Sequence, residues 1–137
     1  MSETIRPVDY YYAEVPDKPG EASRILSELR ASGVNLLAYC GFPSGRWKAQ
    51  IDFIPENAEG FRKAARKLGL KLSDRKRGFL VQGEDRVGAV ADHLQKLGNE
   101  KINVVAGQAV SAGAGRWAMM LWVKPADFKK AAKVLGP

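Results

Sequence analysis

The sequence has few of the residues that build disulfides, metal centres and membrane spans: its 137 residues include one cysteine and one histidine. A single cysteine cannot close a disulfide within the chain, which agrees with a reducing compartment. Zinc sites made of cysteine and histidine use three or four such ligands, so we expect no metal site. No apolar run approaches the roughly 20 residues of a membrane span, and residues 1–6 lack the apolar stretch of a signal peptide. We therefore expect a cytoplasmic protein with no membrane partner.

The same scarcity argues against catalysis. A Ser-His-Asp triad would have to use His93, and the residues around it do not form one in sequence. We expect His93 at the boundary of the core, because it lies at the margin of a predicted helix stripe. Cys40 ends a predicted strand and is interpreted as a half-buried structural thiol, since a reactive thiol needs an electropositive setting. Because the sequence also lacks a paired-carboxylate or phosphate-loop motif, we predict that the chain is not an enzyme.

Positive charge is abundant but confined to one segment. Lys and Arg number 22 against 15 Asp and Glu, which gives a net charge of +7. Residues 62–77 hold eight basic residues and one acidic residue, so this basic segment accounts for the whole surplus. The composition, 45% apolar and 27% charged, is typical of a globular chain. We interpret the basic segment as a solvated helix face that runs into a connector, with a phosphate-binding patch as the alternative.

The two halves of the chain repeat one another. The nonapeptide FRKAARKLG at 61–69 recurs as FKKAAKVLG at 128–136. Other landmarks recur at nearly the same separation and in the same order: Gly20 as Gly88, Asn35 as Asn103, Gly45–Trp47 as Gly115–Trp117 and Pro55 as Pro125. A constant order with similar separations predicts a duplicated unit of about 60 residues. We therefore divide the chain into domains 1–77 and 78–137.

The first copy reads as a β-α-β-β-α-β unit. Aromatic and β-branched residues at 10–15 predict a strand, and Asp-Lys-Pro-Gly at 17–20 predicts a turn. Apolar residues at helical spacing then predict a helix that ends at Gly33. The other expected elements are strands at 34–39 and 47–53, a helix at 61–68 and a fourth strand at 70–72, with a continuation toward Arg77 left open. This order is the ferredoxin-like pattern, an α+β fold in which helices and a sheet form a two-layer α/β sandwich.

The second copy lacks one element. Its predicted strands are 79–82, 102–110 and 117–123, and its predicted helices are 87–97 and 125–135. No fourth strand follows in this sequence. Residues 5–8 or a neighbouring chain fill that edge of the sheet, or the edge stays open.

The turn and the strand that follows the helix resemble the signature of the ACT domain. The first copy carries Val-Pro-Asp-Lys-Pro-Gly at 15–20 and Gly-Val-Asn-Leu at 33–36, and the resemblance covers residues 9 to about 72. The second copy keeps Asp, Gly and Asn but has Val87 in place of Pro and Lys101 in place of Gly. The resemblance implies a tandem ACT domain protein, in which small effectors, often amino acids, bind where two domains or subunits meet. Because the two repeats occupy the sequence, we expect a stand-alone regulatory module.

The physical reason for a site at this turn can be stated from the residue types. Pro restricts φ and Gly permits a close turn, which leaves free amide groups at a helix N-terminus that favour a carboxylate. Helix capping and turn formation explain the same residues without a ligand. If the resemblance holds, the first site is lined by Asp17, Lys18, Pro19, Gly20, Glu21, Asn35 and Leu36. The second is lined by Asp85, Arg86, Val87, Gly88 and Asn103.

One motif points to a cofactor and is set aside. Residues 113–118 match the dinucleotide pattern G-x-G-x-x-A. That pattern requires a helix after the glycines, whereas a strand is predicted at 117–123. We therefore predict no dinucleotide site, and no other cofactor.

The strand predicted at 117–123 is apolar on both faces. Ala118, Met120 and Trp122 occupy a face that is polar in the corresponding strand of the first copy. Helices cover only one face of a two-layer sandwich, so an apolar second face needs another partner. We predict a homodimer formed through this face, in preference to a ligand pocket or simple tolerance of exposed apolar residues.

Two other functions remain open at this stage. RNA-recognition modules share the β-α-β-β-α-β order and stack bases on sheet aromatics, and the tyrosines at 10–12 lie on a predicted strand. The cations lie away from these tyrosines in the predicted fold, which argues against a nucleic-acid partner. A protein-docking adaptor without a ligand is the other alternative.

Overall fold

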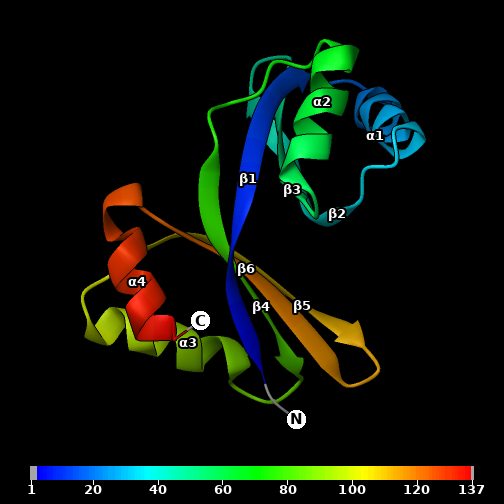
Figure 1. Cartoon of the computed structure of the whole chain (residues 1–137). Helices are drawn as coiled ribbons and strands as arrows, with labels where there is room; N and C mark the ends of the chain where they lie inside the picture. Colours follow the sequence, from blue (N-terminus) through cyan, green and yellow to red (C-terminus); the bar gives the residue numbers. More distant parts are fainter. Residues whose placement is uncertain (1–2, 137) are drawn as a thin grey trace. The chain divides into compact units, whose positions relative to one another are not determined.

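The chain has an α+β fold, as the sequence predicted. The computed structural model describes residues 3–136, and Figure 1 shows its elements along the chain. In order they are β1 (Thr4–Pro16), α1 (Glu21–Ala31), β2 (Leu36–Gly45), β3 (Lys48–Pro55), α2 (Ala58–Leu68), β4 (Lys76–Glu84), α3 (Ala89–Asn99), β5 (Val104–Gly113), β6 (Arg116–Val123), the 3₁₀ turn η1 (Pro125–Asp127) and α4 (Phe128–Leu135). Among the described residues, no helix is both long and apolar enough to cross a membrane.

The elements form two compact units. The N-terminal unit is Asp9–Lys76, and the C-terminal unit is Arg77–Pro137 together with Met1–Val8. These units differ from the predicted division into 1–77 and 78–137 in the place of the first eight residues, so the domain boundary stays a prediction. The strand order is β2-β3-β1 in the N-terminal unit and β1-β4-β6-β5 in the C-terminal unit.

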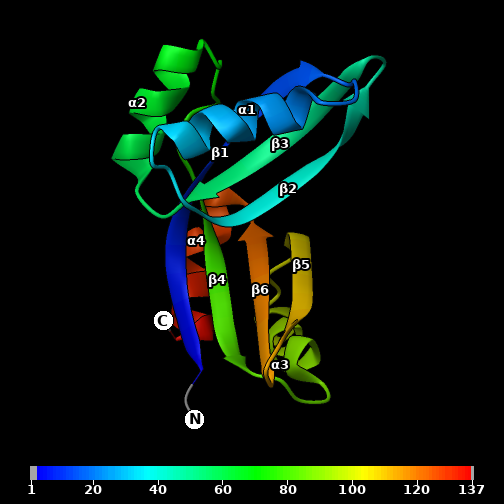
Figure 2. The same ribbon diagram turned by 90° about the vertical axis from the view of Figure 1, so that its right-hand side faces the viewer.

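The start of β1 supplies the edge strand that the second copy lacks. β1 is the neighbour of β4 in the sheet, as Figure 2 shows. Ile5 packs against the core of the C-terminal unit. Of the three expected solutions for the missing strand, the structure therefore has the one that uses residues 5–8.

Each unit places a pair of helices on one face of its strands. In the N-terminal unit, α1 and α2 cover β1 and β3 (Figure 1), and Phe61 of α2 packs against Tyr11 and Phe53 with ring centroids 5.6 and 5.1 Å apart. In the C-terminal unit, Phe79 of β4 stacks on Phe128 of α4 at 4.6 Å. Burial of these large apolar side chains is the main stabilising contribution in each unit.

Strand pairing defines which residues of the two units correspond. Tyr11 pairs with Phe53 on neighbouring strands, and Phe79 pairs with Leu121 in the same relation. Further along the same strands, Val15 pairs with Ala49 and Gly83 pairs with Trp117, so Ala49 is the structural counterpart of Trp117. The predicted match of Gly45–Trp47 with Gly115–Trp117 is therefore wrong by two residues. Trp47 lies in the turn before β3 with φ 63° and is 75% exposed, whereas Trp117 is 3% exposed on β6.

The fourth strand expected at 70–72 is absent, since residues 70–75 form no strand. Ser73 lies beside Tyr12 of β1: the Ser73 amide donates to the Tyr12 carbonyl at 2.8 Å, and the Tyr12 amide donates to the Ser73 hydroxyl at 3.0 Å. Because a side chain satisfies the Tyr12 amide, a main-chain ladder does not continue there. Leu70 and Leu72 instead pack against the apolar core of the N-terminal unit.

The apolar face predicted for dimer formation lies on β6 of the C-terminal unit. Met120 and Trp122 are 5% and 7% exposed, and Ala118 is half-buried. The homodimer stays a prediction.

Candidate functional site

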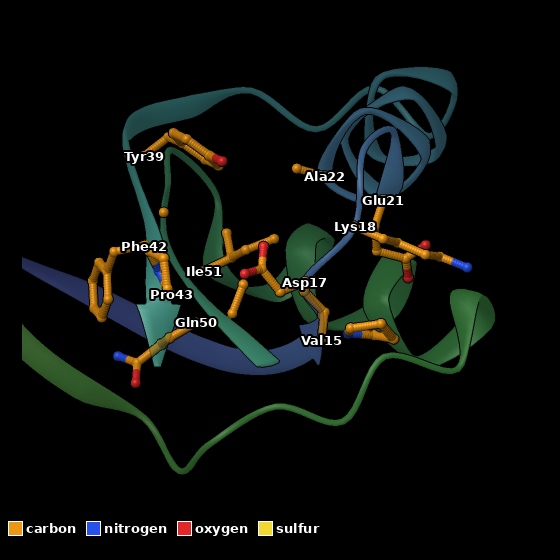
Figure 3. Close-up of a pocket in the computed structure, with 13 residues that line it drawn as sticks. Val15, Asp17, Lys18, Glu21, Ala22, Tyr39, Phe42, Pro43, Gln50 and Ile51 are labelled. Carbon is orange, nitrogen blue, oxygen red and sulfur yellow. The ribbon is translucent and has the colours of Figure 1, made fainter. Parts of the chain in front are cut away.

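A pocket lies beside the turn between β1 and α1, in the N-terminal unit. The turn and the first residues of α1 form one side, and the β2–β3 hairpin forms the other, as Figure 3 shows. We call it the first pocket, and its cavity volume is about 230 Å³. The lining residues are Val15, Pro16, Asp17, Lys18, Glu21, Ala22, Tyr39, Gly41, Phe42, Pro43, Ala49, Gln50 and Ile51.

The turn holds Asp17 in place through its main chain. The Asp17 amide donates to the Trp47 carbonyl at 2.9 Å, which ties the turn to the hairpin. Gly20 has φ 89°, a left-handed conformation that favours glycine, and lets the chain enter α1 directly. No described side chain caps α1, so Asp17 does not act as its N-cap. Figure 3 shows the Asp17 carboxylate directed into the pocket.

The pocket has apolar walls with one further polar group. Ala22 and Ile51 face the space from α1 and β3 (Figure 3), and the Tyr39 hydroxyl also points toward it. A side chain on Gly41 would meet the Tyr39 hydroxyl oxygen at 2.6 Å. The absence of a side chain at Gly41 therefore leaves room for the ring of Tyr39 along the pocket wall.

The other charged residues of the turn are directed away from the cavity. Lys18 and Glu21 point outward in Figure 3. Glu21 accepts a hydrogen bond from Arg24 at 2.9 Å, and this bond lowers the pKa of Glu21. Asp17 is thus the carboxylate that a molecule in the first pocket would meet.

The C-terminal unit has a related pocket at the equivalent turn, which we call the second pocket. Its cavity volume is about 260 Å³. The Asp85 amide donates to the Gly115 carbonyl at 2.8 Å, and Gly88 has φ 82°, so the turn repeats the geometry of the first. The lining residues are Asp85, Arg86, Gly88, Ala89, Val90, Ala91, Ala109, Val110, Ser111 and Trp117.

The structure brings only part of each predicted site together. Asp17, Lys18 and Glu21 line the first pocket, and Asp85, Arg86 and Gly88 line the second. The turn residues Pro19, Gly20 and Val87 lie outside the linings. Asn35, Leu36 and Asn103 also lie outside them.

Asn35 lies away from the first pocket because α1 carries the chain away from the turn. Asn35 follows α1, whose 11 residues span about 16 Å, so it lies at the opposite helix end from the turn. Its carbonyl accepts a hydrogen bond from the Glu56 amide at 2.9 Å, and Leu36 packs against the core. Asn103 follows α3 in the same way. The ligand-binding role of all the predicted residues stays a prediction.

The sequence reasoning missed the hairpin side of both pockets. Tyr39, Phe42 and Pro43 of β2 and Ala49 and Ile51 of β3 complete the first pocket. In the second pocket, Ser111 takes the place of Pro43 and Trp117 takes the place of Ala49. The duplication offers a signal for these residues. Once the hairpin is placed beside the turn in one unit, the repeat places the equivalent hairpin beside the equivalent turn in the other.

A second group of titratable residues lies away from the pockets. Cys40 of β2 pairs in register with Asp52 of β3, which is 8% exposed. Burial raises the pKa of both side chains, and the charge of Asp52 raises that of Cys40 further. A raised thiol pKa disfavours the thiolate. Within residues 3–136, no cluster of three or more His, Cys, Asp and Glu side chains is arranged to hold a metal ion.

Solved structures share this fold. Protein BT0572 from Bacteroides thetaiotaomicron has a TM-score of 0.82 at 14% identity, over 96% of this chain and 88% of that one. The ligand-free regulatory subunit of aspartate kinase from Thermus thermophilus has a TM-score of 0.66 at 13% identity, over 97% and 93%. The equivalent subunit from Thermus flavus has a TM-score of 0.60 at 16% identity, over 98% and 95%. The chain therefore shares its fold with regulatory subunits of aspartate kinase. No family model and no curated protein matches the sequence.

Proposed function

We propose that the chain is a regulatory module of the ACT type, and that its first pocket binds a small amino acid. The observation that carries the proposal is the meeting, at one cavity, of the Asp17 carboxylate with the uncapped first turn of α1. A carboxylate attracts the ammonium group of an amino acid, and amides at a helix N-terminus attract its carboxylate. Both charges of one zwitterion thus have a partner of opposite sign.

The size and walls of the first pocket support a small ligand. Its volume of about 230 Å³ lies below the roughly 300–1,000 Å³ of pockets for drug-sized molecules. Ala22, Ala49 and Ile51 offer apolar surface to a side chain. An amino acid with a small, uncharged side chain matches this combination.

The regulatory part of the proposal rests on resemblance. The sequence resembles ACT domains, and the fold is shared with regulatory subunits of aspartate kinase. We propose that the module works as a homodimer, that the site is completed where domains or subunits meet, and that a separate enzyme is its target. Ligand binding then favours one arrangement of the paired units, which is a population shift.

Titration of the 15N-labelled full chain with each of the twenty amino acids tests the proposal. We expect at least one of them, at millimolar concentration, to shift the amide signals of Asp17, Lys18 and Ala22. Asp17→Asn should weaken that binding about tenfold, because it removes a charge-assisted hydrogen bond. Asp74→Asn, which changes an exposed acidic residue outside the pocket lining, is the matched control. If no amino acid shifts these signals, the chain does not sense amino acids through this pocket, and the adaptor alternative is favoured.

The nucleic-acid alternative has weaker support. Tyr11 is 2% exposed, and its hydroxyl accepts a hydrogen bond from Arg62 at 2.6 Å, so it does not offer its ring to a base. The Arg77 guanidinium lies 4.1 Å from the ring centroid of Phe128, and Arg75 lies 3.7 Å from Asp9. Several cations of the basic segment therefore have partners within the protein. A salt-dependent shift of single-stranded RNA at sub-micromolar protein would support this alternative.

A further inference from the structure

We infer that the two repeat-related pockets are chemically different, and that only the first binds a small primary ammonium compound with an apolar body. This inference rests on the proposed function and specifies which pocket and which end of the ligand are recognised. Its basis is a contrast between Asp17, whose carboxylate is unpartnered, and Asp85, whose carboxylate is already hydrogen-bonded.

The two aspartates occupy the same position in their units. Each follows the first strand of its unit, each donates its amide to the hairpin at 2.9 or 2.8 Å, and each precedes a glycine with φ of 89° or 82°. The cavities have similar volumes, about 230 and 260 Å³. The difference between the pockets therefore lies in the side chains around the aspartate.

The residue that faces the aspartate from the hairpin differs between the units. Ser111 of β5 donates its hydroxyl to Asp85 Oδ2 at 2.9 Å. The counterpart of Ser111 in the first pocket is Pro43, which has no hydrogen-bond donor. Among residues 3–136, the Asp17 carboxylate has no hydrogen-bond or ion-pair partner. Asp17 is exposed, and its carboxylate is free to accept a charge-assisted hydrogen bond from a cationic partner.

Two further side chains differ between the first and the second pocket. Tyr39 directs its hydroxyl into the first pocket (Figure 3), and its counterpart in the second unit is Gly107, so the second pocket lacks this acceptor. Ala49 leaves space on the wall of the first pocket, whereas Trp117 places an indole in the equivalent position. An ammonium group thus meets two oxygen acceptors, Asp17 and Tyr39, in the first pocket, whereas the second pocket has no counterpart of the Tyr39 hydroxyl.

The cationic residues next to the two aspartates, Lys18 and Arg86, leave the difference between Asp17 and Asp85 in place. Lys18 points away from the cavity in Figure 3, so it leaves the Asp17 charge uncompensated. Arg86 is held by Asp92 at 2.7 Å and lies 3.9 Å from Glu3. Arg86 lines the second pocket, where its positive charge opposes a second cation.

The test uses the full chain and a pair of probes that differ in charge but hardly in shape. The probes are 3-methylbutylamine and 3-methylbutan-1-ol, followed through the amide signals of Asp17 and Ala22 in the first pocket and of Asp85 and Val90 in the second. We expect the amine to bind the first pocket about tenfold more tightly than the alcohol does, the worth of one charge-assisted hydrogen bond. At the second pocket the two probes should bind equally weakly.

Substitutions at position 43 then separate the hydroxyl from the loss of proline. Pro43→Ser introduces the hydroxyl that satisfies Asp85 in the other unit, and it should weaken amine binding at the first pocket about fivefold to tenfold. Pro43→Ala removes the proline without adding a donor and should leave amine binding close to that of the unchanged protein. Asp17→Asn should make the amine and the alcohol equal. The NMR spectrum of each variant reports directly whether it is folded.

Three results would overturn the inference: equal binding of amine and alcohol at the first pocket, equal amine binding at both pockets, or equal effects of Pro43→Ser and Pro43→Ala. The proposed function fails on a different result. If an amino acid binds while the amine shows no preference, the module senses amino acids but the inference is wrong. If the amine binds as described while none of the twenty amino acids does, the inference holds and the proposed function is wrong.

Discussion

His93 Nε2 of α3 lies 2.8 Å from Glu3 Oε1, at the start of the segment that leads into β1. The His93 side chain is 2% exposed, and its ring stacks on Trp117 with centroids 5.9 Å apart. The expectation that His93 lies at the boundary of the core is therefore wrong. Arg86 lies 3.9 Å from the same carboxylate, so one acidic side chain lies close both to α3 and to the turn that precedes it.

Replacement of Glu3 should therefore loosen the C-terminal unit. Glu3→Ala removes the carboxylate that lies 2.8 Å from the buried imidazole, and we expect the free energy of unfolding to fall by about 1–3 kcal/mol. Urea denaturation followed by tryptophan fluorescence measures the change. Glu59→Gln is the matched control, because its ion pair with Lys63 is long, at 3.8 Å, and both side chains are largely exposed. Equal losses in the two variants would contradict a specific role for the Glu3–His93 contact.

The glycine before α1 should be difficult to replace. Gly20 has φ 89°, a conformation that L side chains rarely adopt, so Gly20→Ala should destabilise the chain by about 1–2 kcal/mol. Gly45→Ala is the control, since no atom lies within 4 Å of the added side chain and its φ is not positive. Thermal unfolding of both variants gives the comparison. A Gly20→Ala protein as stable as Gly45→Ala would show that the turn relaxes without cost.

Lys101 occupies the position that Gly33 has in the first copy, and both are left-handed, with φ of 59° and 76°. A side chain in this conformation costs energy that glycine avoids. We expect Lys101→Gly to stabilise the protein by about 0.5–1 kcal/mol, measured by urea denaturation. Lys124→Gly, which changes an exposed lysine with φ −61°, is the control and should not stabilise it. Destabilisation by Lys101→Gly would contradict the argument.

The buried Asp52 should make stability depend on pH. Burial raises its pKa in the folded state, so the folded protein binds a proton more readily than the unfolded chain does. Stability therefore falls as the pH rises from the usual aspartate range through the raised pKa, and stays lower above it. We expect Asp52→Asn to stabilise the protein at neutral pH and to have a smaller effect at a pH below the usual aspartate range. Urea titrations across this range measure the difference, and a variant that is less stable than the parent at neutral pH would contradict it.

Much of the fold could be predicted from short stretches of sequence. The turns at Gly20 and Gly88, the helices that follow them and the ferredoxin-like order were all readable, because glycine, proline and apolar spacing act over a few residues. The Gly-Arg-Trp match misled, since an identical tripeptide suggested that Trp47 and Trp117 correspond. Strand pairing instead aligns Trp117 with Ala49, and it puts Trp47 in solvent while Trp117 is buried.

The sequence by itself determined the duplication, the two turns and the elements around them, since these depend on contacts between near neighbours in the chain. Only the tertiary structure decided that the start of β1 joins the C-terminal unit, that Glu3 meets His93, and that the β2–β3 hairpin completes the first pocket. It also decided that Asp85 has Ser111 as a partner while Pro43 leaves Asp17 without one. These relationships join residues that are far apart in the chain, and long-range pairing has no signature in a local pattern of residue types.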